Sequence, residues 1–181
     1  YMIDSFNCAF VNNTASGNLG YNFMLDHSNL CTLSNNTAIS ASIHNFYLNK
    51  SDLCSLTDNK AIGSLGYGVY LYYADLCTLT NNVVTAASLN GIQLYASTRC
   101  ALIHNTVDSN THNGIVLDYS SDCNITKNRI LNNDIGIEIG FSTPSPIRNT
   151  LNLNWIGPNT FNAICQSGGN FWDDGISQGN H

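Results

Sequence analysis

Every twenty-third residue from Cys8 to Cys123 is a cysteine, and this constant interval limits what the chain can fold into more than any other feature. An asparagine follows each cysteine by five positions at the same interval, and an apolar residue follows each by two. Several columns that stay in phase over six units indicate a structural repeat. The two polar columns are Cys8, Cys31, Cys54, Cys77, Cys100 and Cys123, and Asn13, Asn36, Asn59, Asn82, Asn105 and Asn128.

Each repeat contains short apolar stretches that alternate with polar residues and are separated by Asn, Gly and Ser. This alternation is typical of β-strands, and the stretches are too short for helices. Charged residues make up only 10% of the chain, so few charges are available to solvate irregular structure. The backbone N–H and C=O groups must therefore form hydrogen bonds in a regular ladder. The sequence therefore predicts an all-β fold, a right-handed parallel β-helix of about seven coils of 23 residues. Successive coils would lie about 4.8 Å apart and stabilise one another.

We expect residues 1–181 to form a single β-helix domain that opens inside a repeat. It would be a segment of a longer protein or a subunit of an assembly. A Pro-containing inserted loop covers residues 141–148, and a tail motif covers 169–181. After the loop, residues 150–156 repeat 124–130, and the loop lengthens the interval between these two stretches. The same alignment places Cys165 in an inward column, where we expect a buried free thiol.

The tail Gly169-Asn170-Phe171-Trp172-Asp173-Asp174-Gly175, followed by Gly179-Asn180, resembles the Asn-aromatic-Trp-Asp-Asp-Gly module of archaeal cell-surface β-helix proteins. The repeats themselves resemble the β-helix superfamily of carbohydrate-binding and sugar-hydrolase domains, over nearly the whole chain. This resemblance implies the fold but not one activity, because the superfamily includes lyases, hydrolases, epimerases, metal-maturation proteins and surface proteins. One departure is the cysteine column, where family repeats carry Asn or another small polar residue.

Three interpretations of the cysteine column remain open. The thiols fill the core as small apolar residues, or they form disulfides between adjacent coils, or they bind soft metal ions. The disulfide pairs would be Cys8–Cys31, Cys54–Cys77 and Cys100–Cys123. The asparagine column fits a tight bend, where amides bond to those above and below and Asn tolerates left-handed backbone.

The 23-residue interval does not bring a recognisable set of catalytic side chains together. The best carboxylate pair, Asp52 and Asp75, shares one column that continues as Thr98 and Ser121, which favours a solvated edge. We therefore predict no catalytic residue, no metal site and no cofactor, and lean toward a protein that is not an enzyme. Among the remaining candidates, no basic partner is evident for Asp118, Asp122 and Glu138. The position of Asp173 and Asp174 in the tail motif favours turn formation. The histidines His44, His104 and His112 fall in different columns.

Tyrosines give the clearest surface signal. Tyr47 and Tyr70 share one column, and Tyr72 and Tyr95 share another. The alternation of inward and outward residues along each strand predicts that both columns point outward. Tyrosine suits sugar stacking and subunit contacts, so we predict a ligand or partner surface there. The net charge of −6 argues against nucleic acid, and no apolar run reaches the length of a membrane span.

Open strand edges at the ends of a solenoid are sites for pairing with another chain. We therefore expect, first, an extracellular or cell-envelope structural protein that self-assembles through stacked coils into a tube, sheath or filament. The alternatives are a carbohydrate-binding or polysaccharide-cleaving β-helix and a periplasmic metal-handling β-helix. The expected partners are further copies of the chain and, in the second case, glycans.

Overall fold

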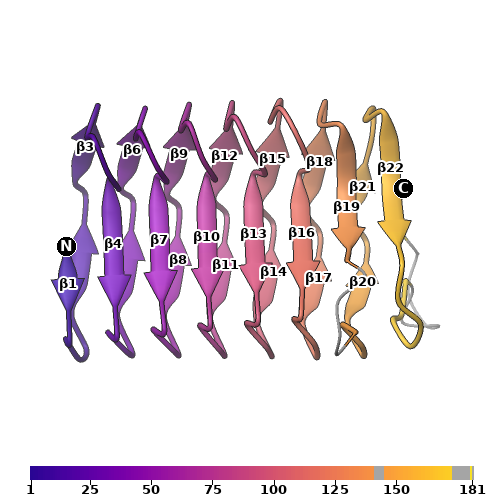
Figure 1. The fold of residues 1–181 in the computed structure, drawn as a ribbon, viewed down its shortest axis with the longest axis horizontal. Coiled ribbons are helices and arrows are strands. Elements are labelled where there is room, and N and C mark those ends of the chain that lie inside the picture. The colour runs from indigo at the N-terminus through magenta and orange to yellow at the C-terminus, as the bar shows by residue number, and fades with distance from the viewer. Residues whose placement is uncertain (141–144, 173–179, 181) are drawn as a thin grey trace.

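The computed structural model describes residues 1–140, 145–172 and 180. Within these residues the chain winds through 22 strands that form three parallel sheets, and each coil adds one strand to each sheet (Figure 1). The prediction of a parallel β-helix is confirmed. The described residues include no helix with the length and apolar character that a membrane span requires.

The first sheet has eight strands and bears the tyrosine columns. We call it sheet A. Its strands, in spatial order, are β1 (Met2–Ile3), β4 (Phe23–Asp26), β7 (Phe46–Asn49), β10 (Val69–Tyr72), β13 (Ile92–Tyr95), β16 (Ile115–Asp118), β19 (Ile135–Ile139) and β22 (Phe161–Cys165).

Two seven-stranded sheets complete each coil. One of them follows the cysteine column and consists of β2 (Ala9–Val11), β5 (Thr32–Ser34), β8 (Ser55–Thr57), β11 (Thr78–Thr80), β14 (Ala101–Ile103), β17 (Asn124–Thr126) and β20 (Thr150–Asn152). The other follows the asparagine column and consists of β3 (Thr14–Ser16), β6 (Thr37–Ile39), β9 (Lys60–Ile62), β12 (Val83–Thr85), β15 (Thr106–Asp108), β18 (Arg129–Leu131) and β21 (Trp155–Ile156).

Strand register reproduces the sequence repeat. Leu79 pairs with Leu56 on one side and Leu102 on the other, and each partner is the equivalent residue of the adjacent repeat. The last coil keeps the columns after the inserted loop, because Ala163 pairs with Ile137. A strand residue and its counterpart one coil away therefore point to the same side of their sheet.

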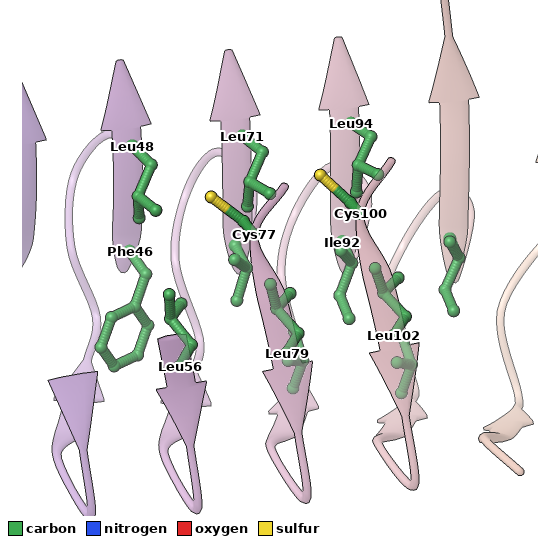
Figure 2. Close-up of a cluster of buried hydrophobic side chains, with 14 of the residues drawn as sticks. Phe46, Leu48, Leu56, Leu71, Cys77, Leu79, Ile92, Leu94, Cys100 and Leu102 are labelled. Atoms are coloured by element: carbon green, nitrogen blue, oxygen red, sulfur yellow. The ribbon is translucent and has the colours of Figure 1, made fainter. Parts of the chain in front are cut away.

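The core is a set of apolar columns that run through the middle of the coils (Figure 2). Leu71, Leu79 and Leu94 are fully buried, and each lies between residues of its own column in the coils before and after. A single coil does not enclose an apolar core, so neighbouring coils supply much of the burial.

Each corner of the coil combines a left-handed residue with an inward-facing one. The prediction that the column asparagines adopt left-handed backbone is wrong, because the left-handed residue is the one before each. Asn81, for example, has a φ of 55°. Asn82 follows and faces the core, where its Oδ1 accepts the Asn59 backbone N–H at 2.9 Å. The left-handed residue turns the chain, and the asparagine satisfies the backbone inside the turn.

The cysteines occupy a corner of the same kind. The backbone N–H of Cys8 donates to Cys31 Sγ at 3.4 Å, and the Cys54 thiol donates to the Ser28 carbonyl at 3.2 Å. After Cys123 the column continues as an asparagine, because the Cys123 N–H donates to Asn149 Oδ1 at 2.9 Å. Cysteine thus performs the donor and acceptor roles of asparagine in this column, and all six of these residues are free thiols in the structure.

Cys165 corrects another prediction. It pairs with the buried Ile139 and so continues an inward column, as the alignment predicted. The thiol is nevertheless exposed rather than buried, because no coil in the described part of the chain stacks on β22.

In four coils, glycines let adjacent coils approach closely near the start of a strand of sheet A, namely β10, β13, β16 and β19. A Cβ added to Gly91 would lie 2.5 Å from Val107 Cγ1 and 2.8 Å from the Gly114 carbonyl oxygen. Gly68, Gly114 and Gly136 meet similar obstacles. The coils have no room for a side chain at these four glycines, whereas Asn22 and Asn45 occupy the same column in the two coils before Gly68.

Candidate functional site: an aromatic surface on sheet A

The outward side of sheet A carries Tyr47, Tyr70, Tyr72 and Tyr95, which we call the tyrosine ribbon. Tyr47 pairs with Tyr70, and Tyr72 with Tyr95, in adjacent coils. The residues between them in each strand are buried, whereas the four tyrosines are partly exposed. The strands of sheet A thus hold both tyrosine columns on one surface.

Ring contacts join the ribbon into one array along the helix axis. Tyr47 stacks on Tyr70 with ring centroids 5.4 Å apart, and Tyr72 stacks on Tyr95 at 5.3 Å. Tyr70 and Tyr72 connect the two columns at 5.7 Å. The stacked rings are tilted from parallel by only 24° and 23°, so their faces are turned toward neighbouring tyrosines. The surface therefore presents mainly ring edges and hydroxyl groups to a ligand.

Further aromatic residues extend this array in both directions. Tyr21 stacks on Tyr47 at 4.9 Å, and Tyr119 lies 5.1 Å from Tyr95. His44 stacks on Tyr67 at 4.9 Å. Sequence reasoning did not include Tyr21 or His44 in this surface.

Burial keeps His44, Tyr47 and Tyr70 of the aromatic surface uncharged at neutral pH. Burial lowers the pKa of His44 to about 4, and its Nδ1 accepts the Tyr67 backbone N–H at 2.9 Å. Burial also raises the pKa of Tyr47 to about 12 and raises that of Tyr70. The hydroxyls of Tyr47 and Tyr70 therefore stay protonated and can both donate and accept hydrogen bonds.

A cavity of about 430 Å³ opens at one end of the ribbon. Its walls are Tyr73, Tyr95 and Tyr119, and Ala96 and Thr98 complete the lining. This volume lies within the range of about 300–1,000 Å³ that is usual for small-molecule sites. The lining combines aromatic rings with hydroxyl groups and includes no charged residue.

Two carboxyl groups lie beyond the ribbon on the same sheet. Asp118 pairs with Tyr95 one coil away and accepts a hydrogen bond from Gln93 Nε2 at 3.1 Å. Glu138 accepts a hydrogen bond from Asn113. Burial raises the pKa of both carboxyl groups. Each is thus held by an amide side chain at the edge of the aromatic surface.

The other acidic candidates serve the backbone or form ion pairs. Asp52 Oδ1 accepts the Asp75 backbone N–H at 2.8 Å, and Asp75 Oδ1 accepts the Thr98 N–H at 2.7 Å. Each of these two carboxylates therefore accepts a backbone hydrogen bond from the next coil. The expectation that Asp122 lacks a basic partner is wrong, because Arg148 donates two hydrogen bonds to it at 2.6 and 2.7 Å. Asp173 and Asp174 lie outside the described residues.

A family model described as "Periplasmic copper-binding protein (NosD)" matches residues 1–176 of the chain. No curated protein matches it. The similar solved structures include the periplasmic alginate epimerase AlgG as its D317A mutant, with a TM-score of 0.83 and 19% identity over 93% of this chain and 45% of that one.

Two further structures show the same fold. The A-module of the mannuronan C-5 epimerase AlgE6 of Azotobacter vinelandii has a TM-score of 0.75 and 14% identity, over 97% of this chain and 58% of that one. The surface adhesin PfbA of Streptococcus pneumoniae has a TM-score of 0.58 and 13% identity, over 85% and 55% respectively. This chain spans about half the length of these proteins.

The name of the family raises the question of copper, and the donor groups of the described residues do not fit that ion. Among the described residues, no three His, Cys, Asp or Glu side chains gather in a way that could hold a metal. The Cys77 thiol is buried and directed at the carbonyls of Ser51 and Asp75, 3.3 and 3.6 Å away. Burial raises the pKa of the Cys31 thiol, which opposes the thiolate form that binds metals at that residue. Hydrogen bonds with neighbouring thiols lower the pKa of Cys54 and Cys100 instead, so the absence of a donor cluster among the described residues is what opposes copper binding.

The family match covers almost the entire chain, and the coils and columns form the parallel β-helix that the similar structures share. The chain belongs to the NosD family of periplasmic β-helix proteins.

Proposed function

We propose that this chain is a carbohydrate-binding β-helix protein of the cell envelope, and that the tyrosine ribbon on sheet A is its glycan-binding surface. The observation that supports this most is the unbroken series of ring contacts from Tyr21 through the ribbon to Tyr119. It coincides with the cavity at the end of the ribbon.

The chemistry of this surface suits a sugar chain. A glycan offers many hydroxyl groups and small apolar patches, and tyrosine matches both with one side chain that loses little conformational entropy on binding. Because the ribbon runs across successive coils, a linear glycan along the axis would meet tyrosines at each step of about 4.8 Å. The protonated hydroxyls supply hydrogen-bond donors along that path.

The comparisons favour this function over self-assembly. The epimerase names identify alginate and mannuronan as the polysaccharides of those proteins, and PfbA is named as a surface adhesin. The family and AlgG are both named as periplasmic, which supports a location in the cell envelope. Stacking of the chain into a tube, sheath or filament stays a prediction.

A glycan array tests the proposal. We expect the purified chain to bind at least one class of immobilised polysaccharide. The double variant Tyr70→Ala/Tyr95→Ala should lose at least tenfold in apparent affinity, which corresponds to about 1.4 kcal/mol. Trp155→Ala is the matched control, because Trp155 is an exposed aromatic residue on β21, in another sheet.

The variants also need a check on folding, since removal of stacked rings costs about 0.5–1.5 kcal/mol for each pair. Circular dichroism and the thermal midpoint should show that the double variant is folded at the temperature of the array. A wild-type chain that binds no glycan, or a folded double variant that binds as well as wild type, would contradict the proposal.

A further inference from the structure

The cavity at the end of the ribbon exists because one ring is missing from a column. Tyr73, Ala96 and Tyr119 are equivalent residues of three successive repeats, in the corner that follows the strands of sheet A. Their φ angles are 51°, 48° and 52°, so each side chain leaves the backbone in a similar direction. Alanine at the middle position leaves a gap between two tyrosines.

The width of this gap follows from the spacing of the coils. Two steps of about 4.8 Å place the Tyr73 and Tyr119 backbones about 10 Å apart. Tyr95 lies between them in the middle coil, and its ring centroid is 6.0 Å from that of Tyr73 and 5.1 Å from that of Tyr119. The rings of Tyr73 and Tyr119 are inclined to that of Tyr95 by 68° and 57°. Three rings in different orientations thus line one open slot.

The lining of the slot indicates the class of its ligand. Five residues form it, and none has a charged side chain. Arg99, which follows Thr98 in the chain, is paired with Asp75 at 3.9 Å. Asp118, which pairs with Tyr95 one coil away, contributes a carboxyl group and no cation. A ligand that carried a carboxylate on each sugar would find no unpaired cation in this lining. A ring with apolar faces and a hydroxyl-bearing edge matches it better.

We propose that the slot over Ala96 is a subsite for one neutral pyranose ring of the bound glycan. This inference rests on the proposed function, since it assigns one position of the glycan to one place on the ribbon. Tyr73, Tyr95 and Tyr119 contact the faces and edges of the sugar, and the Thr98 hydroxyl hydrogen-bonds to it. The remaining tyrosines of the ribbon hold the sugars that follow along the axis.

Replacement of Ala96 by tyrosine tests this subsite directly. Ala96→Tyr supplies the missing ring and fills the slot, and the backbone accepts tyrosine in this conformation one coil before and one coil after. The matched control is Ala86→Tyr, because Ala86 is exposed, has a φ of 56° and lies at a different corner. A second variant, Tyr73→Ala, removes one wall of the slot at a residue that is 47% exposed.

Isothermal titration calorimetry with soluble probes gives the readout. The probes are cellohexaose and mannohexaose as neutral ligands and an oligomannuronate of the same length as the anionic one. We expect the wild type to bind a neutral probe more tightly than the oligomannuronate. Ala96→Tyr and Tyr73→Ala should each weaken that binding at least tenfold, and Ala86→Tyr should leave it within twofold.

The possible failures are distinguishable. If Ala96→Tyr and Tyr73→Ala bind the neutral probe as wild type does, while Tyr70→Ala/Tyr95→Ala does not bind, the slot is not a subsite but the ribbon remains the glycan surface. If the oligomannuronate binds more tightly than both neutral probes, the assignment to a neutral sugar is wrong. If the wild type binds none of the probes and no polysaccharide on the array, the subsite and the proposed function both fail.

Discussion

Asn82→Ala should destabilise the chain strongly, because this side chain joins three coils. Its Nδ2 donates to the Leu56 carbonyl and to Asn105 Oδ1, both at 2.9 Å. Its Oδ1 accepts from the Asn59 backbone N–H at 2.9 Å and from Asn59 Nδ2 at 3.0 Å. Four hydrogen bonds at about 1 kcal/mol each give a loss of about 4 kcal/mol. This is a large part of the roughly 5–15 kcal/mol that stabilises a typical domain.

Urea denaturation followed by circular dichroism measures this loss, with the slope of the transition as a check that the unfolding reaction is unchanged. The matched control is Asn124→Ala on the exposed side of β17, for which we expect a change within about 0.5 kcal/mol. Asn82→Asp keeps the acceptor oxygen but removes both donors and buries a charge, so it should be less stable at pH 7 than at pH 4. A loss below about 1 kcal/mol for Asn82→Ala would refute the view that the asparagine ladder holds the coils together.

Three further predictions concern the core, the close approach of coils and the response to acid. Leu79→Asp should cost at least about 4 kcal/mol, because it removes a fully buried side chain and buries a charge; an unchanged thermal midpoint would contradict the inward assignment of Leu79. Gly91→Ala should lower the thermal midpoint, since its Cβ would meet backbone and Val107, whereas Gly168→Ala, with nothing within 4 Å, should not. Folding lowers the pKa of His44 from 6.5 to about 4, so between these two pH values the unfolded chain binds more protons than the folded one. The free energy of unfolding should therefore rise with pH across that window, by about 2 kcal/mol after allowance for the partial exposure of the ring. His44→Phe should abolish this pH dependence in urea titrations, and a dependence that persists would assign it to another group.

The repeat made most of the fold predictable. Its constant interval aligns the strands of successive coils, and alternation within each strand separates buried residues such as Leu71 from partly exposed ones such as Tyr70. The same register predicts that Tyr47 and Tyr70 share one column, as the structure shows. Parallel pairing of equivalent residues needs no information beyond the sequence interval.

Interactions across the inserted loop were harder to predict. Arg148 reaches Asp122 across an interval of 26 residues, so a search at the shorter, regular interval of the repeat misses the pair. The exposure of Cys165 depends on which coil follows it, and the column position alone does not specify this. The corner geometry also differs from expectation, because the left-handed residue precedes the inward one.

The slot at Ala96 shows a different limit of sequence reasoning. The alignment of Tyr73, Ala96 and Tyr119 is visible in the repeat, and a small residue between two large ones in a surface column is the signal that could have identified the cavity. Attention to the four ribbon tyrosines alone overlooks it, because a site made by the absence of a side chain has no motif. In a solenoid, such gaps are found by comparing residues one coil apart.

Oxidative footprinting of the tyrosines, read by mass spectrometry with and without the glycan that binds best on the array, tests the central claim most directly. Tyr73 and Tyr95 should lose labelling when the glycan is bound, and Tyr1, which is 66% exposed on the first coil, should label equally in both samples. Labelling of Tyr73 and Tyr95 that stays unchanged at a saturating glycan concentration would show that the glycan binds elsewhere and would contradict the account.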